Sequence, residues 1–223
     1  MKHGKKYIAA KAMVESKIYD VAEAVALVKK VKYAKFDGSL DVNIKTAADP
    51  KYNDQAIRGT VVLPHGTGKT VIVAAFVGDD RVDEAKSAGA TIVGNTELIR
   101  SIEAGNIDFD VLVTTPDMIK DLAKVAKILG PKGIMPTPKT GTITTDLQGT
   151  IQEIQKGRIE FKLDKTGNIH AGVGRLSFDD AQLIENVNAL LTAIEALKPA
   201  AIKNKLFKKV TLAPTMGPWV QIG

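Results

Sequence analysis

The sequence contains no cysteine, few aromatic residues and no long apolar run. Without cysteine the chain can form neither disulfides nor thiolate metal sites nor cysteine nucleophiles. Its histidines, His3, His65 and His170, are too far apart in the sequence to show metal-ligand spacing. Aromatic residues make up only 5%, which argues against a large platform for stacking bases. We therefore expect neither a metal site nor a bound cofactor.

The sequence also lacks segments that would direct it to a membrane. No stretch approaches the roughly 18 apolar residues of a membrane span. Residues 1–6 are basic, but no apolar signal-peptide core follows them. With 223 residues, of which 44% are hydrophobic, the chain can build a packed core and form one large domain or two modest ones. We expect a soluble, cytoplasmic protein.

The predicted strands are of two kinds. Near both chain ends, apolar and polar residues alternate, as in residues 40–45 and 159–164. Alternation predicts strands with one buried and one wet face. Residues 71–77, 91–93 and 111–113 are instead continuously apolar, which is typical of parallel strands covered on both faces.

The predicted helices follow the same division. Helices over residues 79–88, 96–104 and 116–129, the last capped by Thr115, alternate with the apolar strands and predict a small doubly wound α/β domain. The outer segments contain two long amphipathic helices. They cover residues 20–34, with Asp20 and Glu23 at capping-box spacing, and 179–197, with Ser177 and Asp180 at the same spacing. Residues 165–168 (KTGN) predict a hairpin turn, so we expect an antiparallel or mixed sheet packed on helices.

The charge is divided between the same regions. Residues 67–157 contain 10 Lys and Arg against 12 Asp and Glu, and the rest of the chain contains 21 against 13. Phosphate neutralisation supplies most non-specific affinity for nucleic acid. RNA would therefore bind the outer segments, unless their basic surface is only a solvated one.

Two glycine-rich segments need separate interpretation. Residues 64–70 (PHGTGKT) resemble a phosphate-binding loop, but Leu63 stands where the full pattern needs a glycine. A predicted strand also follows, where a helix N-terminus should hold the phosphates; a flexible crossing between domains fits better. Residues 130–139 (GPKGIMPTPK) could contact phosphate through their lysines, but Gly and Pro favour a rigid surface loop.

Four segments together carry a resemblance to a known family. They are residues 35–41 (KFDGSLD), 58–66 (RGTVVLPHG), 130–136 (GPKGIMP) and 215–218 (TMGP). In order and spacing they resemble the universal ribosomal protein family called L-one, the first of the large-subunit series, of the bacterial type. The similarity runs the length of the chain.

The resemblance implies an α/β (α+β) fold in two domains. Residues 1–66 and 158–223 would form a discontinuous, split β-α-β RNA-binding domain, and residues 67–157 an inserted Rossmann-like three-layer domain without a nucleotide cofactor. The implied partners are large-subunit rRNA of the mobile stalk, deacylated tRNA leaving the exit site and, by analogy with bacterial members, the protein's own operon mRNA, whose translation it would repress. These roles place the protein in the large subunit of the cytoplasmic ribosome, and we expect a monomer when it is free.

The expected RNA contacts combine residue chemistry with the resemblance. Phe36 either packs on a ribose or base or is buried in the core. The carboxylate of Asp41 either accepts a 2′-hydroxyl bond or only faces water. The loop at Thr215 matches the family's RNA-contacting loop, although it could be a plain turn. The full set of candidate RNA-binding residues is Lys35, Phe36, Ser39, Asp41, Arg158, Lys165, His170, Thr215, Met216, Gly217 and Pro218.

Two other functions stay open. The middle region could be an α/β nucleotide-binding enzyme, although the broken phosphate loop argues against that, and Asp79-Asp80 and Asp179-Asp180 are better explained as helix-start acids. The chain could also be a purely structural interaction module, which would bind RNA weakly and without a salt dependence.

Overall fold

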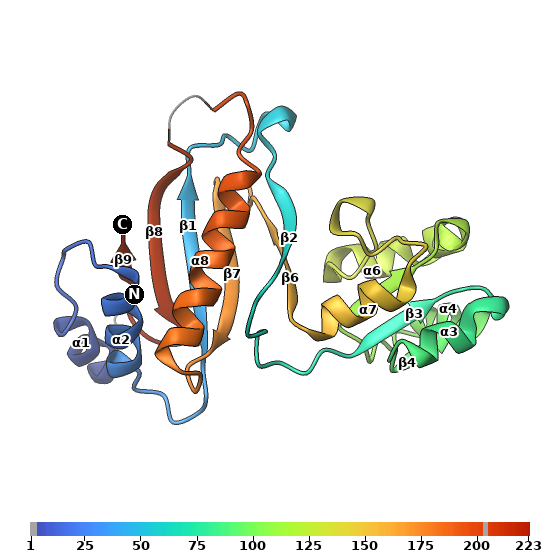
Figure 1. Ribbon diagram of the computed structural model, residues 1–223, viewed down its shortest axis with the longest axis horizontal. Helices are drawn as coiled ribbons and strands as arrows, with labels where there is room; N and C mark the ends of the chain where they lie inside the picture. The colour runs from blue at the N-terminus through green and yellow to red at the C-terminus, as the bar shows by residue number, and fades with distance from the viewer. Residues whose placement is uncertain (1–3, 203–204) are drawn as a thin grey trace. The chain divides into compact units, whose positions relative to one another are not determined.

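The computed structural model describes residues 4–202 and 205–223. Met1 to His3 of the basic N-terminus lie outside the described residues. The chain folds as two compact units, unit 1 (Met1–Lys69 and Gly157–Gly223) and unit 2 (Thr70–Lys156). Both chain ends belong to unit 1 (Figure 1). The fold is therefore of the expected two-part α/β class, and each unit has its own core.

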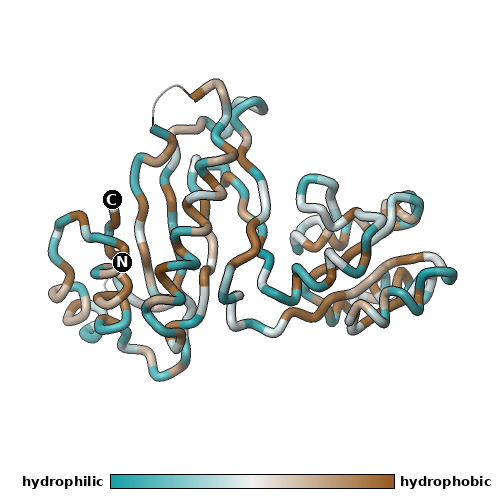
Figure 2. The backbone as a smooth tube through the Cα atoms, in the orientation of Figure 1, coloured by the Kyte–Doolittle hydropathy of each residue, from teal (hydrophilic) through white to brown (hydrophobic). Residues whose placement is uncertain are grey.

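The main sheet of unit 1 is four-stranded and antiparallel throughout. Its order is β7 (Asn168–Arg175), β1 (Ser39–Thr46), β8 (Phe207–Pro214) and β9 (Val220–Ile222). Buried residues alternate with exposed or half-buried ones along β1 and β8, as the sequence predicts; the tube in Figure 2 shows this alternation as changing colour along the strands. One face of this sheet therefore belongs to the core and the other does not.

Helices cover the core face. α8 (Asp180–Ala196) lies along the sheet (Figure 1), α2 (Val21–Val31) packs beside it, and α1 (Lys5–Ala12), which the pattern did not predict, precedes both. Apolar residues of α2 and α8 join those of the strands in one hydrophobic cluster. The predicted helix over residues 20–34 ends three residues early, at Val31, because Lys32 adopts an extended backbone.

The cap predicted for α8 was wrong by two residues. The capping box joins Asp179 and Gln182, whereas Ser177 donates its hydroxyl to Asp37 at 2.8 Å and Asp180 pairs with Lys29 at 2.5 Å. The spacing of Ser177 and Asp180 is suitable for a capping box, but in the folded protein both side chains bind partners from other elements.

A two-stranded sheet completes unit 1. β2 (Arg58–Val62) pairs antiparallel with β6 (Arg158–Lys162), and a short 3₁₀ turn, η1 (Asn53–Gln55), precedes β2. The predicted turn after β6 is confirmed: Gly167 has φ +80° and its N–H donates to Asp164 O at 3.2 Å, which leads the chain into β7.

Unit 2 contains the predicted parallel sheet. Its strands are β3 (Val73–Phe76), β4 (Ile92–Gly94) and β5 (Val111–Thr114), in the order β4-β3-β5, and all described pairs are parallel. Successive residues of β3 belong to opposite clusters, Ala74 and Phe76 to one and Val73 and Ala75 to the other. The sheet is therefore covered on both faces, which explains its continuous apolar strands; β3 is brown in Figure 2.

The helices of unit 2 differ from the prediction at two places. The helix expected over residues 116–129 is a broken run, and Thr115 makes no side-chain cap bond because its side chain is turned into the buried interior. Leu147–Gln155 forms a helix that the pattern did not predict, opened by the Asp146 carboxylate accepting from Gly149 N at 3.0 Å. The helical elements of unit 2 are η2 (Asp79–Arg81), α3 (Val82–Ser87), α4 (Thr96–Glu103), η3 (Pro116–Met118), α5 (Ile119–Leu122), η4 (Ala123–Val125), α6 (Ala126–Lys132), η5 (Pro138–Thr140) and α7 (Leu147–Gln155).

The glycine- and proline-rich segment 130–139 belongs to the framework of unit 2. Pro131 lies inside α6, and Gly133 ends that helix in a left-handed conformation with φ +74°. Ile134 and Met135 pack against the hydrophobic cluster beside the sheet. The structural interpretation of this segment therefore explains its glycines and prolines, while Lys132 and Lys139 remain exposed.

Candidate nucleic-acid interface

The face of the four-stranded sheet that the helices leave uncovered carries mostly polar side chains. The pleat of β1 puts Asp41, Asn43 and Lys45 on this open face, because the residues between them are buried. His170 of β7 pairs with Asn43, and Asn43 pairs on its other side with Thr211 of β8. These residues form a row of hydrogen-bonding groups that runs across three strands, which is a suitable surface for the sugars and base edges of RNA.

His170 is held in place on the open face. Its Nδ1 lies 2.7 Å from Asn43 Oδ1 and its Nε2 lies 3.6 Å from Asp164 Oδ2. Asp164 belongs to the turn that exposes Lys165. Bonds from the Asn168 backbone and the Thr166 hydroxyl lower the pKa of the Asp164 carboxyl to about 2. The carboxylate is therefore charged at neutral pH and fixes the turn that presents Lys165.

Asp41 lies between small residues on the same face. Its neighbours across the two adjacent strands are Gly172 and Ala213. Burial raises the pKa of the Asp41 carboxyl, and the nearby His170 opposes this in part. The carboxylate is therefore half-buried between small neighbours, where a partner with a hydroxyl donor could approach it closely.

The loop after β8 closes one end of this sheet. Thr215 Oγ1 accepts from Ser39 N at 2.8 Å and donates to Ser39 O at 3.3 Å, and Tyr33 donates its hydroxyl to Met216 O. A shallow groove runs between this loop and Phe36. The fold thus brings Phe36, Ser39 and the loop together from opposite ends of the chain.

Exposure distinguishes the two interpretations of Phe36. Its side chain is 53% exposed and Met216 is 57% exposed, so core burial was wrong for Phe36. Lys35 beside it is exposed as well, whereas Pro218 is buried and pins the loop. Two large apolar side chains are therefore exposed at one groove.

Two residues of the loop are held by contacts within unit 1. A Cβ at Gly217 would meet Pro214 Cγ of the loop itself at 2.4 Å. The Thr215 hydroxyl joins the loop to Ser39. Both residues therefore shape the loop, and replacing either changes the fold locally as well as any contact with RNA.

Arg158 does not join the other candidates. It begins β6 in the two-stranded sheet, where its Nη2 donates to Thr60 Oγ1 at 3.1 Å. Sequence reasoning also missed residues of the open face, namely Asn43, Lys45, Lys209, Thr211 and Trp219. Their polar members alternate with buried ones in β1 and β8, which is the signal that could have found them.

A family comparison decides which kind of protein presents this surface. The model of the ribosomal protein L1p/L10e family matches residues 28–218. The chain belongs to the ribosomal protein L1p/L10e family. A relative is the large ribosomal subunit protein uL1 of Kosmotoga olearia, which is 46% identical over 222 residues, 99% of this chain and 96% of the relative. The resemblance found in the four short segments is thereby confirmed.

The phosphate-loop-like segment of this L1p/L10e chain joins the two units instead of opening a helix. β3 is the next element after it, as the sequence predicts. Up to Gly66 the segment is fixed to unit 1: the buried Asn186 side chain accepts from His65 N at 3.1 Å and donates to Gly66 O at 3.0 Å. In unit 2, the first turn after β3 carries Asp79 and Asp80, whose charges would repel a nucleotide phosphate at that position.

The described residues contain no group of three or more His, Asp or Glu side chains placed to hold a metal ion. Among the same residues, no helix is long and apolar enough to cross a membrane.

Proposed function

We propose that this ribosomal protein is a constituent of the large subunit that binds large-subunit rRNA of the stalk through unit 1. Unit 1 is the RNA-binding domain in this proposal, and unit 2 is an inserted domain without a nucleotide cofactor. The protein acts by binding and positioning RNA and catalyses no reaction.

The observation that carries the proposal is the open polar face of the four-stranded sheet, bordered by the Thr215 loop and its exposed apolar neighbours. Unit 1 has 22 Lys and Arg against 13 Asp and Glu, and unit 2 has 9 against 12. A phosphate backbone therefore gains attraction only at unit 1. The hydrogen-bonding side chains of the open face offer the sugar and base contacts that RNA recognition adds to charge.

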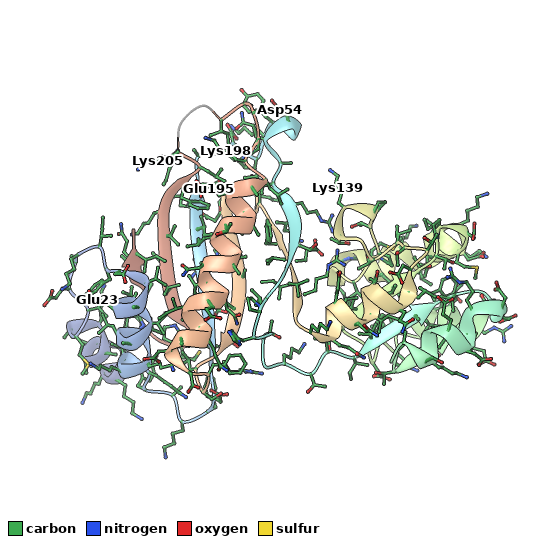
Figure 3. The ribbon with its side chains drawn as sticks, in the orientation of Figure 1. Glu23, Asp54, Lys139, Glu195, Lys198 and Lys205 are labelled. Atoms are coloured by element: carbon green, nitrogen blue, oxygen red, sulfur yellow. The ribbon has the colours of Figure 1, made fainter. Side chains whose placement is uncertain are left out.

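The lysines of unit 1 are distributed unevenly between one end of the unit and the open face of its sheet. One end of it carries Asp54 and Glu195 as well as Lys198 and Lys205 (Figure 3), so charges of both signs are present there. The open face and its turn carry Lys45, Lys165 and Lys209 against Asp41 and Asp164, so lysines are in excess there. We accordingly assign the phosphate contacts to the open face.

The proposed RNA contacts fall into two groups, and Arg158 of the two-stranded sheet is a separate contact outside both. Around the groove, Phe36 and Met216 supply apolar contact, while the backbone at Ser39 and Gly217 lies close to the surface. On the sheet, Asp41 and His170 meet ribose hydroxyls and Lys165 meets phosphate. The full set proposed is Lys35, Phe36, Ser39, Asp41, Arg158, Lys165, His170, Thr215, Met216, Gly217 and Pro218.

In the ribosome, the protein and its rRNA segment form the mobile stalk and move with deacylated tRNA as it leaves the exit site. Two covalent crossings between the units suit such motion, because a few residues near Thr67–Lys69 and Gly157 can absorb the change in backbone angles. The protein also represses translation of its own operon mRNA, where the message presents a similar RNA structure to the same surface.

A titration of the full chain tests the proposal. The probes are a stalk rRNA fragment, a scrambled RNA of equal length and a fragment of the protein's own message, each measured at several salt concentrations. We expect tight, salt-dependent binding to the first and third probes and at least tenfold weaker binding to the scrambled control. Equal affinity for all three would contradict specific recognition, and weak binding without a salt slope would favour a purely structural module.

A further inference from the structure

The open face of the sheet contains a cavity that adjoins His170, Lys45 and Lys209 and extends to Trp219. Its volume is about 310 Å³, and Asn43, Lys45, His170, Lys209, Thr211 and Trp219 line it. The first three come from β1 and β7, and the last three from β8 and the residue just before β9. A cavity of this volume lies at the lower end of the range for small-molecule sites, so it has room for one flat heteroaromatic ring.

Two lysines of the cavity face each other across neighbouring strands. Lys45 of β1 is the register partner of Lys209 of β8, and the pleat puts both on the open face. Like charges directly opposite each other in an antiparallel pair are destabilising. An arrangement that costs stability in the free protein is explained when an anion binds between the two ammonium groups.

Trp219 forms an aromatic wall of this cavity. Its side chain is 49% exposed, although the next residue, Val220, is fully buried and fixes the backbone. Lys209 Nζ lies 3.9 Å from the centre of the Trp219 ring, so a cation–π contact currently stabilises the lysine. A large aromatic ring held at the surface by a rigid neighbour is suited to stack on a nucleobase.

The cavity also offers hydrogen-bonding groups for the edge of a base. Asn43 Oδ1 is engaged by His170 Nδ1 at 2.7 Å, so the Asn43 amide N–H groups can donate to a ligand. The Thr211 hydroxyl donates to Asn43 O at 3.2 Å and keeps its lone pairs as acceptors. Donors and acceptors therefore stand between the aromatic wall and the two lysines.

We infer that this cavity is a subsite for one unpaired nucleotide of the bound RNA, whose base stacks on Trp219 while its phosphate lies between Lys45 and Lys209. The inference rests on the proposed function, because it assumes that RNA covers the open face. On binding, Lys209 exchanges its contact with the indole ring for one with the phosphate, and the base takes its place. In the free protein Lys45 and Lys209 repel each other, and in the complex the phosphate between them neutralises this repulsion.

Tryptophan fluorescence tests the inference directly, because Trp219 is the only tryptophan in the chain. The full chain is titrated with the stalk rRNA fragment while a filter-binding assay follows the same samples. We expect the emission to be quenched with the same midpoint as binding. Trp219→Leu should weaken binding about 5- to 150-fold, the loss expected for one base–aromatic stack, whereas Trp219→Phe should keep most of the affinity.

Two further measurements separate the subsite from general effects. Tyr52→Leu removes another exposed aromatic side chain of unit 1, 58% exposed, and should leave affinity unchanged. RNA fragments that each lack one unpaired base should include one whose loss weakens binding to the wild-type chain but not to Trp219→Leu. That fragment identifies the nucleotide, because two changes that remove the same contact do not add.

The lysine pair has its own signature. Lys45→Met should weaken RNA binding and lower the slope of log affinity against log salt by about 0.7–0.9, yet the melting temperature of the free protein should stay equal or rise as the repulsion disappears. The control is Lys30→Met, which replaces an exposed lysine on α2. It should change neither the RNA affinity, nor the salt slope, nor the melting temperature.

The outcomes distinguish this inference from the proposed function. Binding of the rRNA fragment with unchanged emission, or with equal affinity for Trp219→Leu, overturns the nucleotide subsite and leaves the proposed function standing. Absence of any specific RNA binding by the wild-type chain overturns both. A fall in the melting temperature of Lys45→Met overturns the assignment of that lysine to a repulsive pair.

Discussion

The sheets of the two units differ in how many of their faces are covered. Unit 2 covers both faces of a parallel sheet, and successive residues of β3 belong to opposite hydrophobic clusters. Unit 1 covers only one face of an antiparallel sheet and leaves Asp41, Asn43 and Lys45 accessible on the other. A doubly covered sheet presents loops and helices to a partner instead of its strands, whereas a half-covered sheet offers a broad surface across several strands.

Charge and loop chemistry follow the same contrast. The net positive charge belongs to unit 1, and so does the groove between Phe36 and the Thr215 loop. In unit 2, the comparable loop of residues 137–142 uses its threonine hydroxyls on one another. These differences in charge and in loop structure are the reasons why we propose unit 1, and not unit 2, as the RNA-binding part of the chain.

Separating the units should produce the largest effect. We expect the chain without residues 70–156 to keep stalk-rRNA affinity within about tenfold, while isolated unit 2 should lose more than about 1,000-fold, the usual gap between specific and non-specific binding. Joining residue 69 to residue 157 is feasible because Gly157 lies against Gly66. Gel-shift titrations should follow circular dichroism that establishes folding. Loss of all specific affinity in a folded unit 1 would break the comparison.

Two glycines with positive φ, one in each unit, allow a comparison of how closely the backbone is packed. Gly157 has φ +103°, and a Cβ there would lie 2.4 Å from Gly66 Cα. Gly157→Ala should therefore lower the free energy of unfolding by about 3 kcal/mol, from strain and collision together. Gly105 of unit 2 has φ +88° with open space around it, so Gly105→Ala should cost only about 1 kcal/mol. Urea denaturation measures both, and equal losses would show that close packing at the crossing is unimportant.

Two threonines provide a matched test of function against structure. Thr215 Oγ1 accepts from Ser39 N and donates to Ser39 O; in unit 2, Thr142 Oγ1 accepts from Thr137 N at 2.9 Å and donates to Thr137 O at 3.3 Å. Replacement of either by valine should cost about 1 kcal/mol of stability. Only Thr215→Val should also weaken RNA binding, by roughly tenfold if a contact worth about 1–2 kcal/mol is lost. Melting curves and RNA titrations of both variants decide this, and equal RNA affinities would make the Thr215 loop a plain turn.

The smallest effect concerns pH. The pKa of Asp164 is lowered to about 2 in the folded protein, so its contribution to stability is complete above the unfolded value near 3.9 and is lost as the pH falls through about 2. The pKa of Asp41 is shifted in the opposite direction, because burial raises it. The charged form is therefore disfavoured in the folded protein, so Asp41→Asn should leave stability at neutral pH equal or slightly higher. Carboxyl NMR titration of both residues checks these signs. A lowered pKa at Asp41 would show that an attractive partner, not burial, dominates there.

Sequence patterns predicted the helices and strands better than the contacts between them. The apolar runs predicted β3, β4 and β5, and alternation predicted β1 and the strands around the Lys165 turn, because the side-chain period of a strand indicates how many of its faces are covered. The same reasoning missed α7 and misplaced the cap of α8, since Ser177 and Asp179 are equally good capping residues in isolation. The choice between them depended on Asp37, which is 140 residues away from Ser177 in the chain.

The candidate site was predicted in part. Phe36 and the Thr215 loop were selected by resemblance, and the fold places them at one groove. Arg158 was selected beside them and lies in a different sheet, because closeness in sequence to β7 does not determine which strands pair. Trp219 was not among the predicted RNA contacts, and its exposed ring beside Lys209 became evident only in the fold.

By itself, the sequence determined the family, the α/β class, the periodicity of the strands and the segregation of charge. These are properties of composition and of local order, which survive in the unfolded chain. Only the tertiary structure decided that Lys45 faces Lys209, that the Thr215 hydroxyl is bound to Ser39, and that a cavity forms beside Trp219. Strand register joins residues more than a hundred positions apart, and it is fixed by the burial of the whole sheet face at once; no local pattern contains it.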